Sequence, residues 1–541
     1  MSHDAYAMKV SPPLELHRSP VPIDSLIGRN SVLRKEWPLA LVLAAILFML
    51  LPMFQANFTV TDDHEIVSFF GPDHRVTFSE FFDLVRSRAF ETNGRFRPGY
   101  YVLRIVETTL LGYNPVLWHA NRVFLAFVCA FALYRLIRVA LPPICAAVIT
   151  FLFFSGPQNE IWVNLGAGET YGIVLVLSGL ALAATAIERG ERGVSFSLGL
   201  LLVALAGFVK ESFIPMFPAS VVFIFGVLPR FLPLHIRQRL RVKVSDLIVL
   251  ALLTAGTGIQ LWATIANLHA YGHIYSGQTA WASLARASGW MLGRYSKDTL
   301  WFVPIAAALA ACIPKRSTPL RRARGSHFIQ TVILFAVATV LLLLPQSIVY
   351  GGSPYNAGRY LVPGNLFAVF VAAVGFYYLR CATDGERTRV VRGAVVALLL
   401  VIAVVGALRT FRVSMAEARA SQQFQTRLSD IVRLKRAHPE APLLFCSTKL
   451  LDREPLTSVA TFLSAQLPGD RPYLRTFDWE AVAKSDLDRR LAMLLRHESL
   501  YGDRLFSGIT QFTVRDGQCI GVIFSGSGDS CHCRYAVRMF E

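Results

Sequence analysis

Charged residues are scarce in this chain of 541 residues, since Asp, Glu, Lys and Arg together make up only 17% of it. Soluble globular domains carry about 25% of these residues. Hydrophobic residues reach 54% and the mean hydropathy is +0.46. The shortage of charge excludes an ordinary soluble globular protein and indicates one that is embedded in a membrane.

Other features are missing as well. The chain has 54 Lys and Arg against 36 Asp and Glu, but its arginines flank apolar runs and do not gather on one basic face. This distribution is typical of membrane topology and speaks against nucleic-acid binding. No repeat of fixed period is present. Residues 1–36 lack the apolar core and cleavage site of a signal peptide, so we expect a disordered cytoplasmic tail there.

The eight cysteines lack the spacing of a zinc finger. Four lie in or beside apolar runs and four lie in the polar C-terminal part: Cys129, Cys145, Cys312 and Cys381, then Cys446, Cys519, Cys531 and Cys533. Outside the membrane disulfides are permitted, and we expect Cys519 to pair with Cys531 or Cys533. We predict no cofactor, and leave a divalent metal as an open alternative.

Apolar runs long enough to cross a membrane, or nearly so, fill the middle of the chain. We predict about eleven spans, at 38–56, 115–137, 142–156, 169–187, 194–209, 213–229, 246–267, 298–314, 328–346, 361–380 and 390–410. With the N-terminus inside, the inside turns carry roughly twice as many Lys and Arg as the outside ones. This orientation fits a bacterial inner membrane, with the C-terminal part outside.

Three regions follow from this topology: a cytoplasmic tail (1–36), a transmembrane domain (37–411) and an outside domain (412–541). The transmembrane domain has a long first outside loop, 57–114, with two interfacial helices expected at 78–85 and 99–111. The outside domain is expected to be a small α/β unit. Its elements are a helix at 412–437, another near 480–497, and strands at 442–446, 512–515, 520–524 and 535–540.

The first outside loop opens with Asp62, Asp63, His64 and Glu65, directly after the first apolar run. Charge close to hydrocarbon is costly, so acidic residues at this place indicate a function. Transfer of a sugar to a hydroxyl needs a base for the hydroxyl proton, and a carboxylate is suited to that role. The alternative is a solvated polar loop, and the single imidazole offers no recognised zinc spacing.

Basic residues are few on the outside, and three of them are candidates for binding a phosphate. Arg97 and Arg359 offer the planar fork that fits phosphate oxygens, and Lys210 lies between two apolar helices. Lys210 and Arg359 each have a simpler alternative. Lys210 would pair with Glu211, and Arg359 would extend to the interface as a topologically neutral arginine.

Two further polar sites accompany these candidates. Arg122 lies about two turns inside the second span, where it either serves the site or pairs with Glu107. The turn 158–171 carries amides, an indole and the carboxylate of Glu169, which are the groups of a sugar-binding face. The alternative for that turn is an ordinary connection with Trp and Tyr anchors at the interface.

Taken in order, five stretches resemble the GT-C superfamily of polytopic glycosyltransferases that use lipid-linked sugars. They are residues 62–65, 97–121, 168–169, 210–211 and 358–363. The first, second and fourth are most similar to the membrane part of the transmembrane and tetratricopeptide-repeat O-mannosyltransferases and their bacterial relatives. The resemblance covers roughly residues 37–410, and this chain lacks the helical repeats of those relatives after the last span.

The resemblance implies transfer from a polyprenyl-phosphate sugar on the outer face, with inversion. Asp62 or Asp63 would be the base, Lys210 and Arg359 would hold the phosphate, and Arg97 would assist. The implied substrate-binding residues are His64, Glu65, Glu169 and Tyr360. The acceptor would be a glycan, a lipid or a protein. The alternatives are a transporter or flippase for lipid-linked glycans, and a non-catalytic membrane partner.

Overall fold

The computed structural model describes most of the helical body and four strands near the C-terminus. The described residues are 36–59, 63–68, 80–83, 96–156, 159–190, 193–232, 243–266, scattered positions within 330–342, 359, 362–381, 386–437, 443–447, 461–463, 466–467, 475–478, 509–515 and 519–524. Of the expected N-terminal tail, only Glu36 is among them.

Seven helical segments of the described part are long and apolar enough to cross a membrane. They are α2 (Trp37–Leu50) with η2 (Leu51–Gln55), α6 (Pro115–Arg138), α9 (Glu169–Glu188), the run 211–231, α13 (Val244–Ala266), α17 (Val362–Cys381) and α18 (Glu386–Ala437). Two shorter apolar helices, α7 (Pro143–Phe154) and α10 (Val194–Val209), accompany them. The chain is therefore a membrane protein, as its composition predicts.

Nine of the eleven expected spans coincide with these long and short helices. The span expected at 298–314 lies outside the described residues, and the one at 328–346 is described only at scattered helical positions. The count of eleven therefore stays a prediction. The run 211–231 is irregular, because η4 (Glu211–Phe213), α11 (Met216–Val222), η5 (Phe223–Val227) and η6 (Leu228–Phe231) follow one another. Pro215, Pro218 and Pro229 each remove a helical N–H donor there.

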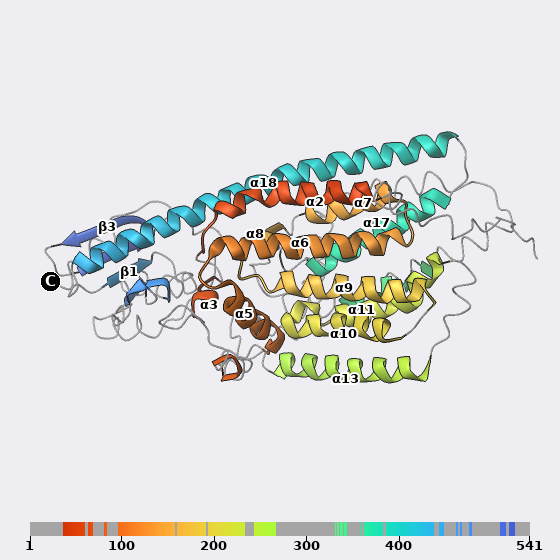
Figure 1. Cartoon of the computed structure of the whole chain (residues 1–541), viewed down its shortest axis with the longest axis horizontal. Coiled ribbons are helices and arrows are strands. Elements are labelled where there is room, and N and C mark those ends of the chain that lie inside the picture. The colour runs from red at the N-terminus through yellow and green to blue at the C-terminus, as the bar shows by residue number, and fades with distance from the viewer. Residues whose placement is uncertain are drawn as a thin grey trace, which may run out of the picture.

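Successive helices run in alternating directions, so the ends fall into two groups (Figure 1). At one end Lys210 and Glu169 form an ion pair, which joins the end of α10 to the start of α9. At the other end Arg138 and Glu36 form one, which joins the end of α6 to the start of α2. The described turns that are expected outside, at residues 159–168 and at Lys210, thus share one end of the bundle, and we call this end the outer end.

Short elements cover the outer end. They are α3 (Asp63–Ser68), α5 (Pro98–Leu111) and α8 (Glu160–Val163). Helix α5 lies within the expected interfacial helix 99–111 and is not among the seven spans. Residues 80–83, inside the other expected interfacial helix, are also helical.

Helix α18 is much longer than a span, with 52 residues and no break. At 1.5 Å per residue it extends about 78 Å, whereas the hydrocarbon core of a bilayer is about 30 Å thick. The sequence predicts a span at 390–410 and a separate helix at 412–437, but the structure joins the two in one helix. Residues 405–420 contain no proline, so nothing in the local sequence ends the helix. The helix continues well past the bundle toward the strands (Figure 1).

Four strands form one sheet in the order β2-β1-β4-β3. They are β1 (Leu443–Ser447), β2 (Arg475–Asp478), β3 (Ile509–Arg515) and β4 (Cys519–Phe524). β1 is parallel to both β2 and β4, and β3 is antiparallel to β4. Three expected strands coincide with β1, β3 and β4, and β2 is additional. The expected strand 535–540, the helix near 480–497, and Cys531 and Cys533 lie outside the described residues, so a separate α/β domain stays a prediction.

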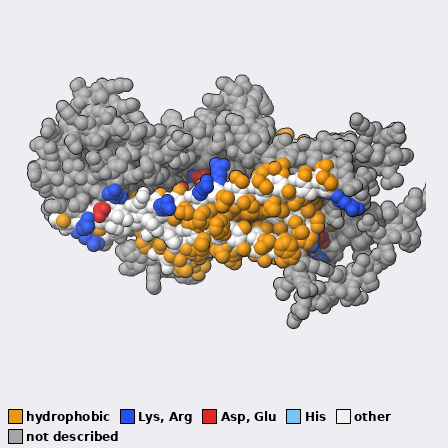
Figure 2. Space-filling view, turned by 90° about the horizontal axis from the view of Figure 1, so that it is seen from above, with side chains coloured by type: hydrophobic (Ala, Val, Ile, Leu, Met, Phe, Trp, Pro, Cys, Tyr) orange, Lys and Arg blue, Asp and Glu red, His pale blue; other side chains and the backbone are white. Residues whose placement is uncertain are grey.

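The bundle surface shows where the membrane lies. Hydrophobic side chains form a band across α18 and α2, with Lys and Arg beyond it on both sides (Figure 2). Leu41, Phe48 and Val401 are among its exposed members. Apolar side chains exposed in such number are stable only against lipid or another apolar surface.

Helices α9 and α10 pack closely against each other in the core. Gly179 and Gly199 face each other, and a Cβ placed on Gly199 would lie 2.6 Å from the Gly179 carbonyl oxygen. Helices within a membrane use such small residues to bring their backbones together.

The Gly199→Leu variant should therefore separate the two helices and destabilise the bundle by about 1–3 kcal/mol. The measurement is the thermal unfolding midpoint of the purified protein in detergent. Gly258→Leu is the matched control, because Gly258 lies exposed on α13 with no atom within 4 Å of its would-be Cβ. Equal midpoints for the two variants would contradict this packing.

Candidate functional site

The outer end of the bundle contains a cluster of buried charges. The first pair is Arg97 with Glu211: Arg97 Nε donates to Glu211 Oε2 at 2.6 Å, and Arg97 Nη2 donates to Oε1. The two residues are 7% and 6% exposed. Arg97 immediately precedes Pro98, which occupies the first position of α5 with its φ already suited to a helix. The pair thus joins the start of α5 to η4.

The second pair is Lys210 with Glu169, whose Nζ and Oε1 lie 3.2 Å apart. Lys210 is extended at the end of α10, and Glu169 is the first residue of α9. Glu169 is therefore an ion-pair partner of Lys210, and the expected alternative, a mutual Lys210–Glu211 pair, stays a prediction. Lys210 is extended whereas Glu211 already begins η4, and the ion pairs described here join them to Glu169 and to Arg97.

A third group of polar residues lies between α5 and α6. Arg104 donates to Glu107 at 3.4 Å and to the Leu165 carbonyl oxygen at 2.8 Å. Asn121 donates to Glu107 Oε1 at 2.5 Å. The expected partner of Glu107 was Arg122, but the ion pair is formed by Arg104, and Arg122 acts on Glu107 only through its charge.

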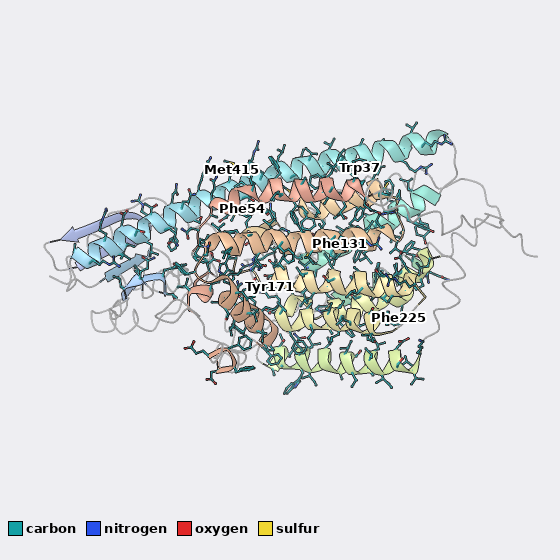
Figure 3. The ribbon with its side chains drawn as sticks, viewed as in Figure 1. Trp37, Phe54, Phe131, Tyr171, Phe225 and Met415 are labelled. Carbon is teal, nitrogen blue, oxygen red and sulfur yellow. The ribbon has the colours of Figure 1, made fainter. Side chains whose placement is uncertain are left out.

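Arg122 is held by the turn before α9 and by an aromatic ring. Its Nη2 donates to the Leu165 carbonyl oxygen, and its guanidinium lies 4.8 Å from the centre of the Tyr171 ring. Tyr171 lies near the start of α9, facing the region where α5 and α6 meet (Figure 3). Burial of this guanidinium is costly, so the carbonyl and the ring are needed as partners.

Asp63 is fully buried, with 0% exposure, at the first position of α3. Its Oδ2 accepts hydrogen bonds from the Thr59 backbone N–H at 2.7 Å and from Thr59 Oγ1 at 3.0 Å. The charge of Asp63 also acts on Arg122, so the carboxylate lies within electrostatic range of the third group. The carboxylate is therefore oriented by the loop that precedes α3, within electrostatic range of Arg122.

The remaining predicted site residues are described less fully. Arg359 is 8% exposed and comes shortly before α17, which packs on α7 and α9. His64 and Glu65 lie on α3, and nothing is described of their side chains. Asp62 and Tyr360 lie outside the described residues. Of the predicted site residues, Lys210 thus pairs with Glu169 and Arg97 pairs with Glu211, while the charge of Asp63 acts on Arg122.

Some residues of the cluster are not predicted as site residues by the sequence. Arg104 is one, and the signal for it is the spacing of Arg97, Tyr100, Arg104 and Glu107, which puts them near one another on α5. Thr59 is another, and nothing in its local sequence distinguishes it. Within the described part of the chain, no three His, Cys, Asp or Glu side chains are grouped so as to hold a metal ion.

No protein-family model, no curated protein sequence and no solved structure matches this chain.

Arg97→Met should destabilise the protein by about 3–5 kcal/mol, because it removes the cation that forms two hydrogen bonds with the buried Glu211 carboxylate. The double variant Arg97→Met/Glu211→Leu should recover a large part of that loss. The measurement is the free energy of unfolding in mixed micelles. A double variant no more stable than the single one would contradict an ion pair between these residues.

Glu107 gives the cluster a pH dependence. Burial raises the pKa of the Glu107 carboxyl, and the charges of Arg122 and Arg104 and the hydrogen bond from Asn121 only partly oppose this. A raised pKa means that the stability contributed by Glu107 is complete below its unfolded pKa and is lost as pH rises through its folded pKa. Glu107→Gln removes that loss.

The thermal midpoint of Glu107→Gln, relative to the wild type, should therefore increase between pH 4 and pH 8. Both proteins are measured in the same detergent across that range. Asp430→Asn on the outer part of α18 controls for the loss of one negative charge. A difference between Glu107→Gln and wild type that is constant with pH would refute this assignment.

Proposed function

We propose that this protein is a membrane glycosyltransferase of GT-C type, with about eleven spans and an α/β domain on the outer side. It transfers a sugar from a polyprenyl-phosphate donor to an acceptor hydroxyl at the outer face of a bacterial inner membrane. The observation that carries the proposal is the position of Asp63, a buried and oriented carboxylate, at the same end of the bundle as the buried cations Arg97 and Lys210.

The chemistry requires few groups. The acceptor hydroxyl oxygen attacks the anomeric carbon, and Asp63 takes the hydroxyl proton as the new bond forms. The bond from the anomeric carbon to the phosphate oxygen breaks, and the electron pair leaves with the polyprenyl phosphate. Attack from the side opposite the phosphate inverts the anomeric centre. Asp62 is the alternative base.

The cations act on the leaving group. Lys210 and Arg359 neutralise the phosphate, with Arg97 assisting, so that charge developing on the leaving oxygen is stabilised. Both Lys210 and Arg97 already have carboxylate partners. A donor phosphate that takes the place of Glu169 beside Lys210 releases the Glu169 carboxylate, which then accepts hydrogen bonds from sugar hydroxyls. His64, Glu65 and Tyr360 complete the substrate contacts.

One observation favours the alternative, a transporter or flippase for lipid-linked glycans. The run 211–231 is discontinuous and begins directly after Lys210, and discontinuous helices form the binding sites of many transporters. The prolines of this run are a sufficient local cause of the irregularity. Turnover separates the two functions, because a flippase binds the donor without cleaving it.

Membranes containing the wild type should release labelled sugar from a polyprenyl-phosphate hexose or pentose, whereas Asp63→Asn should lower kcat by at least roughly 100-fold. Each radiolabelled donor is assayed separately, and both transferred sugar and free polyprenyl phosphate are measured. Asp62→Asn is compared in parallel to decide between the two carboxylates.

Asp83→Asn is the matched control, since Asp83 is an exposed carboxylate in the same outer loop. It should keep wild-type kcat. Full activity in both Asp62→Asn and Asp63→Asn would end the assignment of the base. Donor binding by the wild type without any cleavage would favour the flippase.

A further inference from the structure

The stretch from Gln55 to Thr59 connects the first span to Asp63, and the outer part of α18 holds it. Gln422 Nε2 donates to the Gln55 carbonyl oxygen at 2.8 Å, and the Asn57 N–H donates to Ser421 Oγ at 2.9 Å. Gln425 Nε2 donates to the Phe58 carbonyl oxygen at 3.0 Å. Three side chains of α18 thus bind three backbone groups between Gln55 and Phe58.

An aromatic cluster fixes the same stretch from the other side. The Phe58 ring is fully buried, with its centre 4.9 Å from that of Tyr113 and 6.5 Å from that of Phe462. Phe462 in turn lies 5.4 Å from Phe424 on α18. Residues from the C-terminal part of the chain therefore complete the packing around Phe58.

The stretch that α18 holds, residues 55–58, leads directly to the residue that orients Asp63. Thr59 follows Phe58 directly, and its N–H and its hydroxyl both donate to Asp63 Oδ2. A shift of the Phe58 carbonyl would move the adjoining N–H of Thr59, because the two belong to one rigid peptide unit. The contacts of α18 with residues 55–58 thus influence the position of the Asp63 carboxylate through Thr59.

Helix α18 is itself fixed to the bundle below this contact. Phe411 stacks on Phe48 with ring centres 4.7 Å apart, and Asn159 donates to Thr410 Oγ1 at 3.2 Å. Phe54 on η2 and Met415 on α18 lie where the two elements pass each other (Figure 3). Helix α18 thus runs without a break from its contacts with the bundle, at residues 410–415, to its contacts with residues 55–58.

We propose that the outer part of α18, together with Phe462, is a positioning element for Asp63, and that Gln425 is its principal positioning residue. The proposal rests on the proposed function. The C-terminal part of the chain then acts on the chemical step, and not only on binding of the acceptor. A catalytic group is effective only when its supporting residues hold it in the productive geometry.

Gln425→Met tests this, since it keeps the length of the side chain and removes the N–H donor. We expect kcat for transfer from the polyprenyl-phosphate donor to fall roughly 10- to 100-fold, because small displacements of a catalytic group have effects of that size. KM for the donor should change less than threefold. Gln425→Lys supplies an N–H donor again and should restore part of kcat.

Ser429→Ala is the matched control on the same helix. Ser429 is exposed, and within the described part of the chain its hydroxyl donates only to the Gln425 carbonyl oxygen. Phe462→Ala and Phe462→Leu form a second pair, in which the leucine retains most of the packing. We expect kcat to be lower in the alanine variant than in the leucine variant.

Amide hydrogen exchange gives a readout that does not depend on activity. In Gln425→Met the amides of residues 57–63 should exchange roughly fivefold faster than in the wild type, while those of α9 stay unchanged. Unchanged exchange at 57–63, or faster exchange with an unchanged kcat, would overturn the positioning role. A wild type that cleaves no donor would instead refute the proposed function.

Discussion

Charge buried at the end of an apolar bundle has to be paired, and this constraint organises the outer end of the protein. Arg97 and Glu211 join α5 to η4, while Lys210 and Glu169 join α10 to α9. Removal of one partner from such a pair costs several kcal/mol, so each pair fixes the relative position of two elements. Because Lys210 and Glu211 are adjacent in the chain, the two pairs are also joined to each other.

In the proposed function the same ion pairs also bind the substrate, because a substrate anion replaces the carboxylate partner of a cation. A buried lysine or arginine beside a carboxylate stabilises an anion that takes the carboxylate's place. In the proposed reaction the donor phosphate is that anion, and the displaced carboxylate turns to the sugar. In that proposed reaction, an ion pair that is structural without substrate becomes the binding site with substrate.

Asp63 depends on a different kind of support. Its carboxylate lies at the first position of the short helix α3, and its orientation comes from Thr59 in the preceding loop, whose adjoining peptide is held in turn by α18. Loops position catalytic groups well only when a rigid element fixes them. The uninterrupted length of α18 provides this element, which explains why a helix that crosses the membrane continues far beyond it.

Much of the architecture follows from local sequence. Apolar runs between basic turns predicted α2, α6, α9 and α13 nearly to the residue, because a membrane selects for length and apolarity alone. The alternation of basic turns also predicted that Asp63, Arg97 and Lys210 would share one end of the bundle. The continuity of α18 was not predicted, because the composition changes from apolar to polar near residue 411 although no residue there ends the helix.

Pairings between distant residues were a different matter. The sequence determined that charges gather at one end of a membrane bundle. The lengths of the apolar runs and the charges of the turns between them are local features, and they fix where each span begins and ends. It did not show that Arg97 meets Glu211, 114 residues away, or that Gln425 meets Phe58, 367 residues away. Partners of this kind are chosen by how helices pack and where side chains point, and those depend on the whole fold. The tertiary structure alone decided which carboxylate each cation faces.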